Sequence, residues 1–262
     1  MVAKNLKLIF KYFKLNLQKE YQYKTSFFTK IIMMILNNAF FILQWIIIFG
    51  VTESIGGYGF KEVMLLWALS AMGYGIAHAL FSGAFNIANL IYEGRLDVFL
   101  TQPKNVLVNL ICSETSVSAL GDIAYSFIAL ALAGASWWWY LAIIPVGIVG
   151  ALIYVGITIC FQTLSFYVKR GSAIADTIGS AMMLVSNYPP VIFNTIAKIL
   201  LFTIIPCGFM IFLPAESIFL GFSIWGIVAM LGFALLVTIL AFILFKKGLK
   251  KYNSGSLMGG RL

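Results

Sequence analysis

Long apolar runs alternate with short polar segments along the chain. A transmembrane helix needs about 20 apolar residues, and several stretches meet or approach that length. They are Ser26 to Val51, Val63 to Ile91, Val106 to Ala133, Leu141 to Val168, Ser172 to about Asn187, and Phe222 to Phe245. This pattern predicts an all-α integral membrane protein with six transmembrane helices, organised as a single transmembrane domain over residues 1–262.

The region from Ser172 to Leu213 does not fit one straight helix. It contains Pro189, Pro190 and Pro206, and proline removes a hydrogen-bond donor and clashes with the preceding turn. Two full spans here would make seven and would put the two termini on opposite sides of the membrane. We expect instead a fifth span that ends near Asn187, followed by an outer re-entrant hairpin at residues 190–213. Its broken backbone must be covered by protein or by a water-filled cavity.

The basic residues predict which side of the membrane each loop occupies. They precede the first span and follow the second, fourth and last spans: Lys4, Lys7, Lys11, Lys14, Lys19, Lys24, Arg95, Lys104, Lys169, Arg170, Lys246, Lys247, Lys250 and Lys251. The loops on the other side contain only Lys61. By the positive-inside rule both termini are cytoplasmic, including the tail at 246–262, and the number of spans is even.

The first 24 residues predict an amphipathic helix that lies on the inner membrane surface. Leu6, Ile9, Phe10, Phe13 and Leu17 recur at helical spacing, and lysines occupy the other side. Such a basic helix binds membrane lipid. Two interpretations remain open, because the helix could only anchor the first span or could also transmit motion from a partner.

Composition and missing motifs exclude several classes of protein. The chain is 61% hydrophobic and 10% charged, with a mean hydropathy of +0.98, which a soluble globule cannot bury. The net charge of +9 reflects bases at helix ends rather than a nucleic-acid surface. No GxxxxGK[ST] or HExxH motif occurs and there is one histidine, so we expect no ATP hydrolysis by this chain alone, no metal site and no cofactor.

Polar residues inside the predicted spans are candidates for a translocation pathway. His78, Ser82, Asn86, Asn89 and Glu93 are spaced as one face of the second span, and Glu114 and Asp122 lie in the third. The pathway candidates are His78, Ser82, Asn86, Glu114 and Asp122. For Asn86 and Asn89, hydrogen bonds between helices, worth about 0.6 kcal/mol each, are the slightly favoured alternative. The carboxylates could instead pair with Arg95 or Lys104, or the polar stretch could belong to the cytoplasmic side.

The cytoplasmic loop at residues 92–104 predicts a short helix. Gly94 permits a break after the second span, Leu96, Phe99 and Leu100 form an apolar face, and Pro103 ends the element. An apolar helix face of this kind suits a docking element for a cytosolic partner. An interfacial loop helix without a partner is the competing interpretation.

The sequence GRLDVFLTQP at residues 94–103 and the tail Lys251-Tyr252-Asn253-Ser254 resemble the membrane subunits of type-two ABC exporters, in a branch of small bacterial permeases. The basic first helix, six spans and broken outer hairpin match as well. The resemblance implies a permease subunit in the bacterial cell membrane that pairs with a second, identical or similar permease chain. Separate cytosolic ATPase chains would bind ATP and Mg. The loop would be the coupling helix, with Glu93, Arg95, Leu96, Asp97, Leu100 and Pro103 contacting the ATPase.

Two other classes compete with this interpretation. In an ion-gradient-driven secondary transporter, Glu114 and Asp122 would be the coupling carboxylates. That class is often built from inverted repeats, and none is visible in this sequence. A membrane scaffold without transport activity is the third class. The sequence does not identify a substrate.

Overall fold

A computed structural model describes residues 2–168, 171–219 and 224–252, and Lys169, Arg170 and the tail from Asn253 onward lie outside the described residues. Within these ranges the regular elements are helices, apart from one isolated bridge between Ile55 and Tyr58. The α-helices are α1 (Val2–Tyr21), α2 (Lys24–Val51), α3 (Phe60–Phe81), α4 (Ile87–Tyr92), α5 (Asp97–Leu100), α6 (Val106–Ile111), α7 (Ala119–Leu132), α8 (Trp137–Gln162), α9 (Gly171–Val185), α10 (Thr195–Thr203), α11 (Leu213–Phe219) and α12 (Ile224–Leu249). Short 3₁₀ or π segments are η1 (Ser82–Asn86), η2 (Thr163–Phe166), η3 (Pro190–Ile192) and η4 (Gly208–Phe212).

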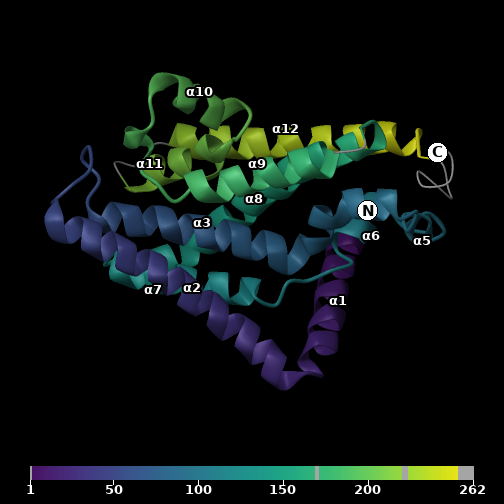
Figure 1. Ribbon diagram of the computed structural model, residues 1–262, viewed down its shortest axis with the longest axis horizontal. Coiled ribbons are helices and arrows are strands. Elements are labelled where there is room, and N and C mark those ends of the chain that lie inside the picture. The colour runs from purple at the N-terminus through teal and green to yellow at the C-terminus, as the bar shows by residue number, and fades with distance from the viewer. Residues whose placement is uncertain (1, 169–170, 220–223, 253–262) are drawn as a thin grey trace.

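The long helices form an elongated bundle around α3. Helices α7 and α8 pack against α3, α2 packs against α7, and α12 packs against α8 (Figure 1). The start of α1, the short helix α5 and the end of α12 gather at one end of the bundle, which we call the loop end (Figure 1). The chain therefore returns to the end at which it starts.

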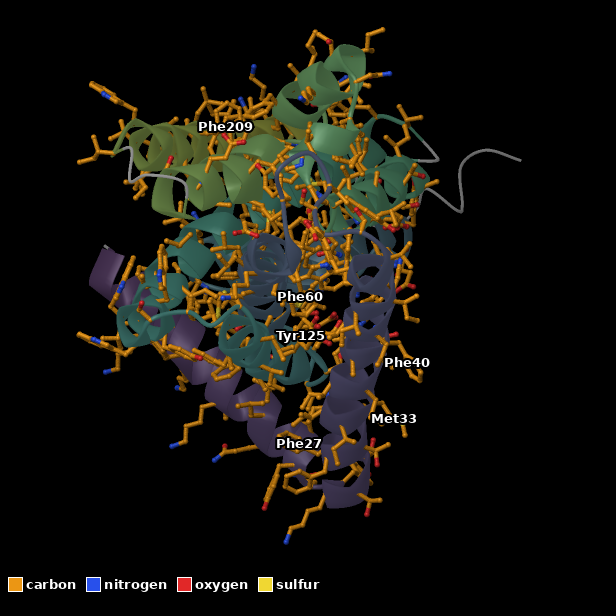
Figure 2. All side chains as sticks on the ribbon, turned by 90° about the vertical axis from the view of Figure 1, so that its left-hand side faces the viewer. Phe27, Met33, Phe40, Phe60, Tyr125 and Phe209 are labelled. Carbon is orange, nitrogen blue, oxygen red and sulfur yellow. The ribbon has the colours of Figure 1, made fainter. Side chains whose placement is uncertain are left out.

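Helix α3 is the core of the bundle, because nearly every side chain from Val63 to Ala79 is buried. A helix that is apolar all round is stable only in such a position or in a membrane. Helix α2 is equally apolar, yet only Asn38 and Trp45 are buried in it. Met33 and Phe40 point outward from α2 and are 58% and 71% exposed, whereas Tyr125 lies inside the bundle (Figure 2). Helix α2 therefore offers an apolar face to lipid or to another chain.

Four helical stretches are long and apolar enough to cross a membrane: Lys24–Val51, Phe60–Tyr92, Trp139–Phe166 and Ile224–Leu249. A bent pair, Thr195–Thr203 with Gly208–Ser217, raises the number to five if it is one span. Helices α7 and α9 are apolar but have 14 and 15 residues. At 1.5 Å per residue they reach only about 21–23 Å of the roughly 30 Å hydrocarbon core. The predicted all-helical membrane fold is confirmed, and the count of six spans stays a prediction.

The prediction of a continuous third span from Val106 to Ala133 is wrong. The chain forms α6, then an irregular segment at residues 112–118, then α7. Hydroxyl groups stabilise the break, because Ser113 Oγ donates to the Leu110 carbonyl at 2.7 Å and the Ser116 and Ser118 hydroxyls are 2.9 Å apart. The Ser116 N–H also donates to the His78 carbonyl at 3.0 Å. Short hydroxyl side chains compete with helical hydrogen bonds in this way.

The proline-rich region breaks where the prolines predict. Helix α9 ends at Val185, Pro190 begins η3, and the two arms around Pro206 meet at 84°. An angle of this size belongs either to a broken span or to a re-entrant loop, so the re-entrant topology stays a prediction. Helix α11 extends the region to Phe219, beyond the predicted end of the hairpin at Leu213.

The predicted N-terminal helix is present as α1, which meets α2 at a steep angle (Figure 1). Lys30 Nζ lies 2.6 Å from Glu20 Oε2 across this junction, an exposed ion pair that contributes at most about 1 kcal/mol. On the predicted apolar face, Ile9, Phe13 and Leu17 are half-buried, and Phe10 is 66% exposed. The position of α1 on a membrane surface stays a prediction.

Candidate functional site

The loop after α4 begins with a well-defined helix C-cap. Gly94 has φ +69°, a left-handed conformation that glycine adopts readily. The Arg95 N–H donates to the Leu90 carbonyl at 3.0 Å and the Gly94 N–H to the Ile91 carbonyl at 3.4 Å. These two bonds form a Schellman motif, which satisfies the last carbonyls of α4 and fixes the direction in which the chain leaves it.

The loop helix α5 is a single turn with one buried side and one exposed side. Leu96, directly before it, is fully buried, and Phe99 packs against the core. Val98 is 60% exposed and Leu100 is 40% exposed. The predicted apolar face is therefore divided, because Leu96 anchors the loop to its own chain while Val98 and Leu100 present apolar surface at the loop end.

Charged residues and a proline border the exposed apolar surface of Val98 and Leu100. Arg95 Nη1 lies 2.9 Å from Glu93 Oε2, and both side chains are about half exposed or more. Pro103 is exposed in the turn that follows α5. Asp97 is half-buried, and burial of the Tyr252 phenol, followed by the nearby Asp97 carboxylate, raises the pKa of that phenol above its ordinary value. Tyr252, from the far end of the chain, therefore lies against the loop.

The described end of the chain and η2 share one aromatic cluster at the loop end. The Phe166 ring packs edge-on against Tyr252 and Phe245, with ring centroids 6.4 and 5.9 Å apart. The Tyr92 hydroxyl donates to the Val168 carbonyl at 3.1 Å. The segment after α8 thus contacts the described end of the chain through Phe166 and the start of the loop through Val168.

The first helix is hydrogen-bonded to the same loop through Asn109 on α6. The Tyr12 hydroxyl donates to Asn109 Oδ1, and Asn109 Nδ2 donates to Gln102 Oε1 at 2.5 Å. Asn109 is fully buried, so its amide is costly unless both partners stay in place. Lys104 Nζ also lies 5.5 Å from the centre of the Tyr12 ring. Helix α1 and the loop are therefore connected through one buried amide.

The predicted polar stripe along the second span does not form one helix face. The helix changes to 3₁₀ geometry in η1, so the spacing of 3.6 residues per turn on which the predicted stripe depends does not hold between His78 and Asn89. The Gln162 amide on α8 supports this change, because Gln162 Oε1 accepts from the Ala88 N–H and Gln162 Nε2 donates to the Phe85 carbonyl, both at 3.0 Å. The prediction from helical spacing fails here because the buried Gln162 amide satisfies backbone N–H and C=O groups that the change to 3₁₀ geometry leaves without helical partners.

A cavity of about 590 Å³ lies between α2, α3, α7 and α9. Its floor is made of buried side chains such as Trp67 and Tyr74 on α3. Its rims carry exposed side chains, Gln44 on α2 and Leu184 on α9 among them, so the mouth opens between these two helices. In Figure 1, α3 lies between α2 on one side and α9 on the other. The volume is typical of a site for one small molecule.

The structure brings two of the five pathway candidates to this cavity. His78 and Asp122 line it, whereas Ser82, Asn86 and Glu114 are not among its lining residues. Asn86 Nδ2 donates to Glu114 Oε1 at 3.1 Å, nearer to the loop end. Four of the five candidates therefore fall into two groups, His78 and Asp122 at the cavity and Asn86 with Glu114 at the irregular segment, while Ser82 lies at the start of η1.

Asp122 lies in the first turn of α7 and has an amide partner on α2. Asn38 Nδ2 donates to Asp122 Oδ1 at 2.7 Å. An anion in the first turn is favoured by the N–H groups of that helix end. His78 lies opposite, where its ring stacks on Phe85 with centroids 4.0 Å apart. Within the described ranges no group of three His, Cys, Asp or Glu side chains could hold a metal ion.

Sequence reasoning missed four polar residues that organise this region: Tyr12, Asn38, Asn109 and Gln162. Asn109 interrupts the apolar run Val106–Ile111 and Gln162 the run of α8. A lone amide in an apolar helix is the signal that could have revealed both, since such groups need partners. Tyr12 gave no such signal, because it belongs to a helix with many polar residues.

A helical chain with several membrane-length helices, a short helix with exposed apolar side chains at one end and a cavity between its helices has an architecture that suits a polytopic membrane transporter. Comparison of the sequence with known protein families supports this assignment, because the family model for ABC-2 family transporter proteins matches residues 32–256. The chain belongs to this family, and it is a membrane component of the ABC transporter class rather than a catalytic enzyme. No curated protein matches the chain, and no solved structure does.

Proposed function

We propose that this chain is the permease subunit of an ABC exporter and is driven by separate cytosolic ATPase chains that bind ATP and Mg. The observation that carries the proposal is the loop helix α5. It exposes Val98 and Leu100 at the end of the bundle where both described chain ends lie, and Leu96 anchors it to the core. An exposed apolar turn held on a buried anchor suits docking to a partner.

The contacts of the loop give the ATPase a route into the membrane helices. The Schellman bonds connect the loop to α4, Asn109 connects it to α1, and Tyr252 places it beside the end of α12. A displacement of α5 would therefore move several helices together. In this proposal Glu93, Arg95, Asp97, Leu100 and Pro103 face the ATPase. Leu96, which is fully buried, sets the position of the helix instead of touching the partner.

Polar side chains at the mouth of the cavity favour an assembly with a second permease chain. Asn37 and Gln44 on α2 and Ser180 on α9 are exposed there, on helices that are mostly apolar. Amide and hydroxyl groups at membrane depth favour contact with protein or water over lipid. A second chain, identical or similar, would cover this mouth and complete a pathway between the two. The loop end would then face the cytoplasm of a bacterial cell, in agreement with its basic residues.

The competing secondary-transporter mechanism needs its two carboxylates to act on one ion. Asp122 accepts a hydrogen bond from Asn38 at the cavity, and Glu114 accepts one from Asn86 outside it. The two carboxylates therefore lie at different sites and are not arranged to bind one ion, which favours the ATP-driven mechanism.

Purification of the full-length tagged chain from mild detergent tests the proposal. We expect a cytosolic chain with a GxxxxGK[ST] motif to copurify, because α5 has exposed apolar surface at the loop end. The complex should hydrolyse ATP in the presence of Mg. A permease that is folded and inserted but carries no such chain, even when membranes are crosslinked before extraction, would contradict the proposal.

A further inference from the structure

The wall of the cavity between α2, α3, α7 and α9 is rich in aromatic side chains and carries a carboxylate. Five aromatic residues contribute to it: Phe41, Trp45, Trp67, Tyr74 and Tyr188. Among the described lining residues the one carboxylate is Asp122, and there is neither lysine nor arginine. This is notable in a chain with twice as many basic as acidic residues, 18 against 9. The basic side chains lie elsewhere, and the cavity is left with an acidic group inside aromatic surface.

We propose that this cavity binds an amphipathic organic cation, a molecule with a flat or apolar body and one positively charged nitrogen. The inference rests on the proposed transport function and specifies the class of substrate for its pathway. The cation would lie near Asp122 with its body against the aromatic wall. An organic anion would meet the carboxylate without any lysine or arginine in the described lining to offset it.

The aromatic rings are arranged in a way that suits such a ligand. Phe41 and Trp67 lie with their centroids 5.1 Å apart, and Trp45 and Tyr188 are 5.7 Å apart. Cations are attracted to the faces of aromatic rings, most strongly to tryptophan and most strongly where water is excluded. One ring pair comes from α2 and α3 and the other from α2 and the turn after α9, so the rings border the cavity on more than one side.

Asp122 is held in place for this role. Its Oδ1 accepts the 2.7 Å bond from Asn38, which is itself 7% exposed. An uncharged donor fixes the direction of the carboxylate but leaves its negative charge without a basic partner. A cation that enters the cavity would supply that partner, and the Coulomb attraction is larger there than in bulk water.

Ethidium binding to the full-length chain in lipid nanodiscs tests the proposal. Trp45 and Trp67 line the cavity, so a bound aromatic cation should quench tryptophan fluorescence. We expect saturable quenching by ethidium that weakens about tenfold or more in Asp122→Asn, which keeps the size and the contact with Asn38 but removes the charge. The matched control is Glu114→Gln, a carboxylate outside the lining, which should bind ethidium as tightly as the unchanged chain.

A variant of the aromatic wall and an anionic competitor complete the test. Phe41→Leu removes an aromatic face at a residue that is 40% exposed, and it should weaken ethidium several-fold, on the order expected for one cation–π contact. The aromatic anion 8-anilinonaphthalene-1-sulfonate should compete poorly in the unchanged chain. Equal ethidium affinity in Asp122→Asn and Glu114→Gln, or anion binding as tight as ethidium binding, would overturn the proposal. Because this assay needs no ATPase, such a result would leave the proposed docking at α5 intact.

Discussion

Leu100→Asp should detach the ATPase while the permease stays folded and inserted. Leu100 is 40% exposed on α5, beside Val98, so its side chain is available to a partner at the loop end. Loss of a buried leucine typically costs about 2–5 kcal/mol, which weakens an assembly by well over tenfold. A carboxylate would add the penalty of a charge in an apolar contact. The measurement is ATPase copurification and ATP hydrolysis in membranes.

The matched control is Val51→Asp. Val51 is 90% exposed at the end of α2 away from the loop, so this change places the same acid on exposed apolar surface outside the proposed interface. We expect it to retain the ATPase. Normal copurification and normal hydrolysis with Leu100→Asp would identify α5 as an ordinary interfacial helix.

Gly83→Ala should destabilise the folded chain and distort the base of the loop. A Cβ atom at Gly83 would lie far inside contact distance of the Leu110 carbonyl oxygen, and 3.0 Å from Ser113 Oγ. Two backbones approach here, η1 and the end of α6, so the obstruction is not the end of a flexible side chain. Overpacking of this kind costs typically about 1–3 kcal/mol and occasionally more. Thermal unfolding of the purified chain in one detergent measures the change.

Gly232→Ala on α12 provides the comparison. No atom lies within 4 Å of a Cβ placed there, and alanine in a helix interior is favoured over glycine by about 1 kcal/mol. This variant should unfold at the same temperature as the unchanged chain or higher. If Gly83→Ala were as stable as Gly232→Ala, the close packing of η1 on α6 would not be important for the fold.

Local chain chemistry made much of the fold predictable. Apolar runs located α2, α3, α8 and α12, because a membrane-length helix needs only composition and length. Pro189 and Pro206 marked real breaks, since proline acts on its own backbone. Gly94 marked the end of α4 for a similarly local reason, because its left-handed conformation completes the Schellman motif.

The errors of prediction arise where a distant residue decides the local structure. The second span looked like one helix because the Gln162 amide that supports η1 is on α8, more than 70 residues away. The third span looked continuous because its residues are mostly apolar, and of the alternatives left open for its polar stretch, the break found at residues 112–118 agrees best with a segment outside the span. Leu96 looked like a partner contact because periodicity identifies an apolar face but not what covers it.

The candidate cavity was only partly predictable for the same reason. His78 and Asp122 were chosen because ionisable groups are costly in a membrane, and both do line the cavity. Its aromatic wall could not be recognised, since Phe41, Trp67 and Tyr188 come from three separated segments and look like ordinary apolar positions in each.

Photo-crosslinking from the loop tests the docking claim most directly. A photoreactive amino acid at Val98, which is 60% exposed, would be irradiated in intact membranes, with the same group at the fully buried Leu96 as the control. We expect the Val98 position to form an adduct with a second protein that contains a GxxxxGK[ST] motif, and the Leu96 position to react only within its own chain. Adducts from Val98 that contain only lipid or this chain itself would contradict the claim that an ATPase docks on α5.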